Sequence, residues 1–200
     1  MLYTVLGRGV RQALEATDIS KTSAGVDPFA ASVSTAPSPW QAMGAWAQTL
    51  ADHVAGDQPA QHVTVFVHDA PVDALRLVGQ VWGTGEDTGE VVPGLFIVPL
   101  DGTVSGRVFR TGDAALCADV SLDPDYRAFP GVRTRSSLTV PLVRDEAVVG
   151  VINVEAPWIS AFSVADYERL TKLAASAVTT MPGGTMPGSG PVAEVGPPAA

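Results

Sequence analysis

The chain has 200 residues, of which 46% are hydrophobic and 16% charged, so its apolar content is enough for the core of one domain. Its formal net charge of −9 at pH 7 disfavours nonspecific binding to nucleic acid and to anionic membrane surfaces. The single cysteine, Cys117, excludes an internal disulfide and a zinc site made of several cysteines.

Neither a membrane span nor a secretory signal is expected. No apolar run approaches the roughly 18 residues that a spanning helix needs. The segment 1–20 lacks a basic start followed by a long apolar run, which is the pattern of a secretory signal. We therefore expect a cytoplasmic protein.

The first part of the chain is predicted to hold an arm and then a long helix. Residues 1–16 are compatible with a helix weakened by glycines, and residues 17–37 have the composition of a linker or surface arm. The long helix begins after Ser38, which can cap it, and ends at Gly56. Its apolar face repeats at steps of three and four residues and comprises Trp40, Met43, Ala47, Leu50 and Val54.

A pair of antiparallel strands is predicted next. The strands cover residues 61–69 and 74–82, with a turn between them, and a loop rich in glycine follows over residues 83–89. The first strand alternates strictly between two faces. One face carries Val63, Val65 and Val67, and the other carries His62, Thr64, Phe66 and His68.

The stretch from residue 95 to residue 155 mixes short strands with one helix and one long polar excursion. Glycine and proline mark most of the boundaries between these elements. The predicted order is a strand over 95–100, a helical segment within 101–112, a strand over 114–120, an irregular excursion over 121–135, and a hairpin of strands 137–143 and 147–155.

A last helix and a tail complete the chain. Ser163 is placed to cap the helix, with Asp166 at the third helical position, where a negative charge favours the amide end. The composition then changes to Pro, Gly, Ser and Ala, so we expect residues 181–200 to form a flexible tail after a domain that spans 38–180. The expected buried stripe of the helix is Val164, Tyr167, Leu170, Ala174, Ala177 and Val178.

The order of these elements predicts the fold class. Strands come in pairs, helices lie at both ends, and one crossover helix lies between. This pattern indicates an α+β domain with a mainly antiparallel sheet and helices packed on it.

Several runs of residues, taken in order, resemble the GAF domain family. They are TVSGRVFRTGDAALCADVSLDPDYR, RSSLTVPL, VVGVINVEAP and AFSVADYERLTKLA, within residues 91–178. The resemblance implies a central sheet of five or six strands, with the terminal helices together on one face and a ligand pocket with a lid on the other. It also implies that the domain binds small ligands or pairs with a second copy.

The pocket is predicted between the sheet and the excursion 121–135. A loop of this length inside a compact domain is usually functional, and Tyr126 and Phe129 are suited to roof a cavity. Arg133 and Arg135 would then lie near its rim and could pair with a carboxylate or phosphate. The expected ligand-binding residues are Trp82, Phe96, Cys117, Asp119, Tyr126, Phe129, Arg133, Arg135 and Ser137.

The basic residues leave the charge of the ligand open. Six of the twelve lie between residues 101 and 144 with five acidic residues, so this segment has a net charge of +1 in an acidic chain. One interpretation is an anionic ligand near the lid. The other is a set of arginines that are solvated or paired with nearby acidic groups.

Catalytic and metal-binding patterns are sparse. His62 and His68 share a strand face but lie about 20 Å apart, too far for one metal site, so ordinary structural roles are expected. Some members of the resembled family reduce free methionine sulfoxide with several cysteines, whereas Cys117 has no second cysteine to resolve it. The motifs of bilin-binding and cyclic-nucleotide-binding members are also incomplete, because Ala118, Val154 and Tyr167 replace characteristic residues.

The sequence therefore predicts a non-catalytic sensory or regulatory module. It would bind a small molecule, form a homodimer through its terminal helices and report to a signalling partner, with no cofactor or metal. The alternatives are a structural pairing module with a vestigial pocket and a redox enzyme related to the sulfoxide reductases.

Overall fold

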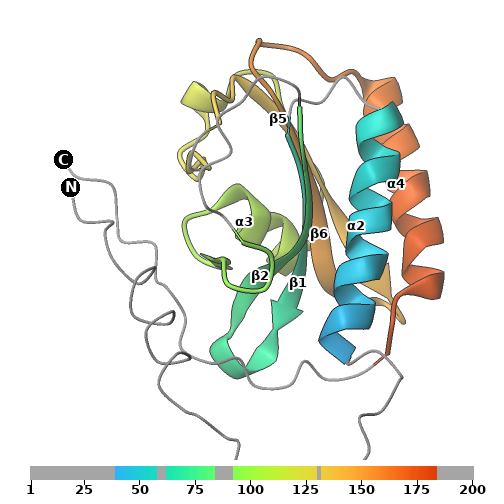
Figure 1. Ribbon diagram of the computed structural model, residues 1–200. Helices are drawn as coiled ribbons and strands as arrows, with labels where there is room; N and C mark the ends of the chain where they lie inside the picture. Colours follow the sequence, from blue (N-terminus) through green and yellow to red (C-terminus); the bar gives the residue numbers. More distant parts are fainter. Residues whose placement is uncertain (1–38, 58–61, 84–91, 130–131, 184–200) are drawn as a thin grey trace, which may run out of the picture. The chain divides into compact units, whose positions relative to one another are not determined.

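The computed structural model describes residues 39–57, 62–83, 92–129 and 132–183, all within one compact unit, Pro37–Ala200 (Figure 1). The predicted helix 1–16 and linker 17–37 lie outside the described residues. So do most of the glycine-rich loop 83–89 and most of the tail 181–200. Within the described part of the chain, no helix has the length and apolar composition needed to cross a membrane.

Six strands form one sheet in which every neighbouring pair is antiparallel, as predicted. The order across the sheet is β3-β2-β1-β6-β5-β4, so the first strand lies beside the last at its centre. The strands are β1 (His62–Asp69), β2 (Ala74–Trp82), β3 (Ile97–Pro99), β4 (Ala115–Cys117), β5 (Ser136–Arg144) and β6 (Ala147–Ala156).

Two helices cover one face of the sheet, and a third lies on the other face (Figure 1). Helices α2 (Pro39–Asp57) and α4 (Val164–Ala177) run side by side, and the indole Nε1 of Trp46 in α2 donates to the Ala177 carbonyl at 3.1 Å. Helix α3 (Val104–Thr111) packs on the opposite face. This arrangement confirms the α+β fold expected from the sequence.

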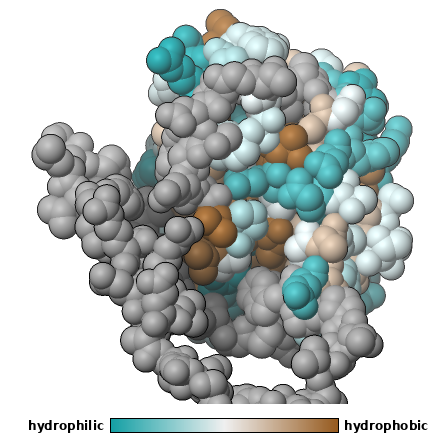
Figure 2. Space-filling view, in the orientation of Figure 1, coloured by the Kyte–Doolittle hydropathy of each residue, from teal (hydrophilic) through white to brown (hydrophobic). Residues whose placement is uncertain are grey.

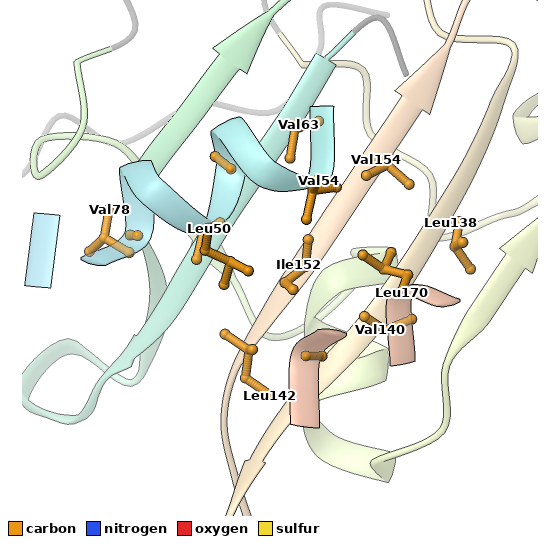
Figure 3. Close-up of a cluster of buried hydrophobic side chains, with 14 of the residues drawn as sticks. Leu50, Val54, Val63, Val78, Leu138, Val140, Leu142, Ile152, Val154 and Leu170 are labelled. Atoms are coloured by element: carbon orange, nitrogen blue, oxygen red, sulfur yellow. The ribbon is translucent and has the colours of Figure 1, made fainter. Parts of the chain in front are cut away.

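The main core lies between the sheet and the helix pair α2 and α4 (Figure 3). Four of the five residues predicted for the apolar face of α2 are buried there, namely Met43, Ala47, Leu50 and Val54, while the side chain of Trp40 lies outside the described residues. The valines of β1 meet this face from the sheet, as their alternation predicted. The labelled core residues are Leu50, Val54, Val63, Val78, Leu138, Val140, Leu142, Ile152, Val154 and Leu170.

A glycine in β2 allows α2 to approach the sheet closely. A Cβ atom on Gly79 would lie 2.6 Å from the backbone of Ala47, which is closer than atoms can pack. Gly44 lies in the same helix, yet a Cβ there would meet Val78 at an ordinary 3.9 Å. The close contact is therefore specific to Gly79.

The cap of α4 is as predicted, but its buried stripe is not. The Ser163 side chain accepts from the amide of Asp166, and the Asp166 carboxylate accepts from the amide of Ser163, which completes a capping box. Val164 and Tyr167, however, are 64% and 37% exposed. The prediction for these two was wrong because Phe162, just before the cap, fills the core at this end.

Two strands are shorter than predicted, while the hairpin turn is as predicted. The strand expected over 114–120 ends at Cys117, because Asp119 accepts from the amide of Ser121 and starts a short helical turn, Val120–Leu122. The strand expected over 95–100 covers only Ile97–Pro99. The hairpin of β5 and β6 turns at Asp145 and Glu146, which both have positive φ, in keeping with the predicted tight turn.

The surface on the side seen in Figure 1 is mixed. Figure 2 shows hydrophobic residues scattered among hydrophilic and neutral ones, without one large apolar patch among the described residues of this face. Such scattered exposure is normal for a folded domain and does not by itself mark an interface.

Candidate functional site

One line of side chains crosses five strands on the face that α3 covers. Residues paired directly across antiparallel strands share a face of the sheet. At the usual strand spacing the line is about 19 Å long. From β2 to β4 the pairing register aligns Trp82, His62, Glu155, Ser137 and Cys117, which we call the polar row.

The next row along the strands is also polar, but its members bond to one another. Thr139 Oγ1 donates to Asn153 Oδ1 at 2.8 Å, and Thr64 Oγ1 donates to the Asn153 carbonyl at 3.5 Å. Beyond it, Phe66 and Val151 are apolar and pack under α3. The polar row differs in holding a buried ring nitrogen, His62 Nε2, that has no partner among the described residues.

The centre of the polar row is a buried pair of His62 and Glu155. The two side chains are 0% and 3% exposed, and His62 Nδ1 lies 3.1 Å from Glu155 Oε2. In this pair Nδ1 can donate to Glu155, because an ionised carboxylate only accepts hydrogen bonds. The other ring nitrogen, Nε2, is buried and has no partner among the described residues. Such an unpaired buried group costs about 1–3 kcal/mol of stability.

Aromatic rings enclose this histidine. Its ring stacks on Trp82 with centroids 4.0 Å apart and meets Phe129 at 4.6 Å. Phe129 in turn lies 4.8 Å from Phe96 and 5.9 Å from Trp82. We call the three rings around Phe129 the aromatic box, formed by His62, Trp82 and Phe96.

Tyr126 lies near the Glu155 side of the row. Its hydroxyl and that of Thr134 are both buried and neighbour each other, and neither has a further partner among the described residues. Burial raises the pKa of Tyr126 strongly, and the negative charge of Glu155 raises it further, while the neighbouring Thr134 hydroxyl acts in the opposite direction. The phenol is therefore neutral at physiological pH and keeps its proton for donation.

The segment that carries Tyr126 and Phe129 closes over the row, and we call residues 120–129 and 132–135 the lid. Its two ends are fastened together, because the Val120 amide donates to the Arg135 carbonyl at 3.0 Å. The Arg135 amide donates to the Ala156 carbonyl of β6 at 2.7 Å, which ties the lid to the sheet.

Helix α3 clamps the lid through one arginine. Arg107 donates from both terminal nitrogens to Asp123, at 3.1 and 2.6 Å, and from Nη1 to Asp125 at 2.6 Å. The hydrogen bond and charge of Arg107 hold the pKa of Asp123 below its ordinary value. This clamp fixes the start of the lid against the helix.

An open hollow of about 410 Å³ adjoins the β4 end of the polar row. Cys117 belongs to both, so the hollow meets the row at this thiol. Burial raises the pKa of Cys117, and the nearby charge of Asp123 adds to the effect, which makes the thiol a poor nucleophile at neutral pH. The hollow is lined by Arg107, Thr111, Asp113, Ala114, Ala115, Leu116, Cys117 and Asp123.

Six of the nine residues predicted for the site gather around the polar row. Trp82, Ser137 and Cys117 belong to it, Phe96 and Phe129 form the aromatic contacts, and Tyr126 lies over it. The ring of Phe129 lies between the sheet and the lid, where a ligand pocket was predicted from the sequence. The structure places the other three, Asp119, Arg133 and Arg135, at the outer side of the lid.

The arginines outside the polar row are solvated or paired with nearby acidic groups, which was one of the two interpretations of the sequence. Arg135 is 55% exposed, and its guanidinium lies 3.5 Å from Asp119. Arg110 pairs with Asp101, and Arg133 is exposed. With Arg107 engaged by the lid, these cations do not converge on the polar row. The row itself carries the carboxylate of Glu155.

The residues at the centre of the site were not predicted from the sequence. His62 was expected to have an ordinary structural role, and Glu155 and Thr134 were not considered. A usable signal was present, since His62 and Glu155 are polar residues at the ends of strands that are otherwise rich in valine and isoleucine. Their pairing depends on β1 lying beside β6, which the sequence alone did not establish.

The described residues offer no metal centre. Within them, no three histidine, cysteine, aspartate or glutamate side chains gather closely enough to hold an ion. The chemistry that this arrangement supports is hydrogen bonding and ring stacking in a covered, largely dehydrated space.

Solved structures with the same fold include enzymes and sensory domains. The type II free methionine-R-sulfoxide reductase of Thermoplasma acidophilum is 20% identical with a TM-score of 0.60, over 72% of this chain and 95% of that one. The free methionine-R-sulfoxide reductase of Neisseria meningitidis is 24% identical with a TM-score of 0.57, over 68% and 77%. The GAF domain of an Acinetobacter phosphoenolpyruvate-protein phosphotransferase is 19% identical with a TM-score of 0.59, over 74% and 84%.

Sequence comparisons give the family but no characterised relative. No curated protein matches the chain. The family model for the GAF domain matches residues 44–181, which is more than half of the chain and includes every described strand and helix except the first turns of α2. Together with the six-stranded antiparallel sheet and its helices, this match shows that the chain belongs to the GAF domain family.

Proposed function

We propose that this chain is a non-catalytic sensory or regulatory module that binds a small molecule between the polar row and the lid. The observation that carries the proposal is the unfulfilled bonding capacity there. His62 Nε2 is buried without a partner in the described part of the chain, and the neighbouring hydroxyls of Tyr126 and Thr134 have no partner beyond each other. Buried polar groups are nearly always hydrogen-bonded in native proteins, so these groups favour a ligand that completes their bonding.

The lid offers a route from the site to the surface. Its end is bonded to Ala156, immediately before the connection to α4. Ser136, the first residue of β5, holds that connection. Its Oγ donates to the Trp158 carbonyl at 2.8 Å and accepts from the Ala161 amide at 3.2 Å. A ligand that moves the lid would therefore perturb the start of α4, which is one of the two helices proposed to contact a partner.

The proposed partner is a second copy of the chain, with signalling proteins as further partners. Helices α2 and α4 lie on one face, and Ala175 and Ser176 are small exposed residues that allow a close approach. Trp46 is held by Ala177, and the side chain of Trp40 lies outside the described residues. Light scattering at tens of micromolar should give the mass of a dimer, and a monomeric mass would rule out this part of the proposal.

The redox alternative lacks support from the site. Two solved reductases share the fold, but at 20% and 24% identity the likeness extends to the fold alone. Cys117 is the single cysteine, and its pKa is raised. We expect neither the wild type nor Cys117→Ser to reduce free methionine-R-sulfoxide with a thiol reductant. Turnover by the wild type that is lost in the variant would establish the enzyme instead.

The proposal is tested by removing and restoring the ligand. Protein purified under native conditions is compared with protein that has been unfolded, dialysed and refolded. The native preparation should melt at a higher temperature, and the low-mass filtrate of a cell extract should restore that temperature to the stripped protein. Equal melting temperatures, together with no response to the filtrate, would favour the pairing module with a vestigial pocket.

A further inference from the structure

The ring of Phe129 occupies the aromatic box as a ligand would. It is 9% exposed, and the three rings around it lie 4.6, 4.8 and 5.9 Å away by their centroids. His62 and Trp82 are on the neighbouring strands β1 and β2, and Phe96 immediately precedes β3. Phe129 alone belongs to the lid, so it is the ring that leaves when the lid lifts.

We propose that the ligand presents a flat, uncharged nitrogen heterocycle that replaces the Phe129 ring in this box. The inference rests on the proposed function of the same site and adds the chemical class of the ligand. The spacing and mutual tilt of the rings suit another planar ring, because offset and edge-to-face contacts are favourable at centroid separations of 4.5–7 Å.

The charges around the box select against an anion. Glu155 is 3% exposed and lies beside His62, which is itself a wall of the box. Arg107 donates its hydrogen bonds to Asp123 and Asp125 of the lid, and Arg135 lies at the surface beside Asp119. A buried anion here would face a carboxylate without a converging cation, and burying an unpaired charge is costly.

Polar atoms at and near the box give the ligand groups to bond. His62 Nε2, on a wall of the box, has no partner among the described residues, and the neighbouring hydroxyls of Tyr126 and Thr134 on the lid can each donate or accept. A ring nitrogen and its neighbouring N–H offer an acceptor and a donor in the plane of the ring. A nitrogen heterocycle therefore satisfies these groups without a charge, which an aromatic hydrocarbon does not.

The test makes room in the box and offers three probes. Phe129→Ala is titrated with benzimidazole, with benzoate and with cyclohexanol by calorimetry at pH 7.5. Phe162→Ala is the matched control, because Phe162 is also buried but lies in the core on the helix side of the sheet. We expect benzimidazole to bind Phe129→Ala at least ten times more tightly than either other probe, and at least ten times more tightly than it binds wild type or Phe162→Ala.

A second change tests the hydrogen bonds. Adding Tyr126→Phe to Phe129→Ala should weaken benzimidazole by about five- to tenfold, the usual effect of one lost hydrogen bond. Should Phe129→Ala fail to fold, Phe129→Leu keeps an apolar lid side chain while removing the planar ring, and the same order of probes is expected. Benzoate binding as tightly as benzimidazole, or Phe162→Ala binding benzimidazole equally well, would overturn the inference.

The heterocycle inference and the proposed function can fail independently. A natural ligand that is anionic or lacks a planar ring would overturn this inference and leave the proposed function intact. If Phe129→Ala selects benzimidazole as expected but the native and stripped wild type behave identically, the box is as inferred and the proposed function fails.

Discussion

Replacing the buried pair His62 and Glu155 tests whether the polar row serves binding or stability. Either single change, His62→Phe or Glu155→Met, leaves the other polar group buried and alone. The side chains are 0% and 3% exposed, so almost no solvent is available to compensate. Breaking such a pair from one side costs about 3–5 kcal/mol, so two independent losses would sum to about 6–10 kcal/mol.

The double variant is expected to behave differently. His62→Phe keeps a ring to stack on Trp82 at the present 4.0 Å, and methionine resembles glutamate in volume. With both polar groups gone, no unpaired atom of this pair remains, and exchanges of this kind are commonly neutral or stabilising by 1–4 kcal/mol. Urea unfolding should therefore place the double variant within about 1 kcal/mol of wild type or above it, with a large coupling energy between the sites. A double variant as unstable as the sum of the two single variants would show instead that the pair stabilises the fold.

Three further changes test the fold and the lid. Gly79→Ala should lose about 1–3 kcal/mol of unfolding free energy, because its Cβ would lie 2.6 Å from the Ala47 backbone. Gly44→Ala, whose nearest contact is at 3.9 Å, should instead gain up to about 1 kcal/mol. Equal effects of the two variants in urea unfolding would contradict the close contact at Gly79. Ser163→Ala should cost about 0.5–2 kcal/mol through the lost capping box, while the exposed Glu168→Ala on the same helix should change the melting temperature little. Asp123→Asn should cost about 1 kcal/mol, discounted because Arg107 is 35% exposed. Since the pKa of Asp123 is lowered in the folded protein, this difference should be complete above about pH 4 and shrink as the pH falls further, and a difference that grows on acidification would argue against the clamp.

Features that depend on neighbouring residues could be predicted from the sequence. The capping box of Ser163 and Asp166 and the tight hairpin turn before Ala147 are fixed within a few residues, and both are present. The alternation of β1 assigned Val63, Val65 and Val67 to the helix side, where they are buried. The family resemblance then supplied the arrangement of the sheet and helices, which periodicity alone left open.

The site was harder to predict because it is assembled across the sheet. His62 and Glu155 are 93 positions apart in sequence, and only the adjacency of β1 and β6 brings them together. Asp119 and Arg135 looked like ligand contacts, but each had a nearer partner in the other. Phe129 was correctly expected to face inward, while the three rings that receive it come from separate segments of the chain.

The presence of a bound ligand can be measured from the mass of the natively purified protein. The comparison is between wild type and the His62→Phe, Glu155→Met double variant. Native mass spectrometry should show wild type carrying an additional small molecule that is released on unfolding. The folded double variant, which lacks two polar members of the row, should have the mass of the chain alone. The same bound mass on both proteins, or none on wild type, would contradict a ligand site beneath the lid.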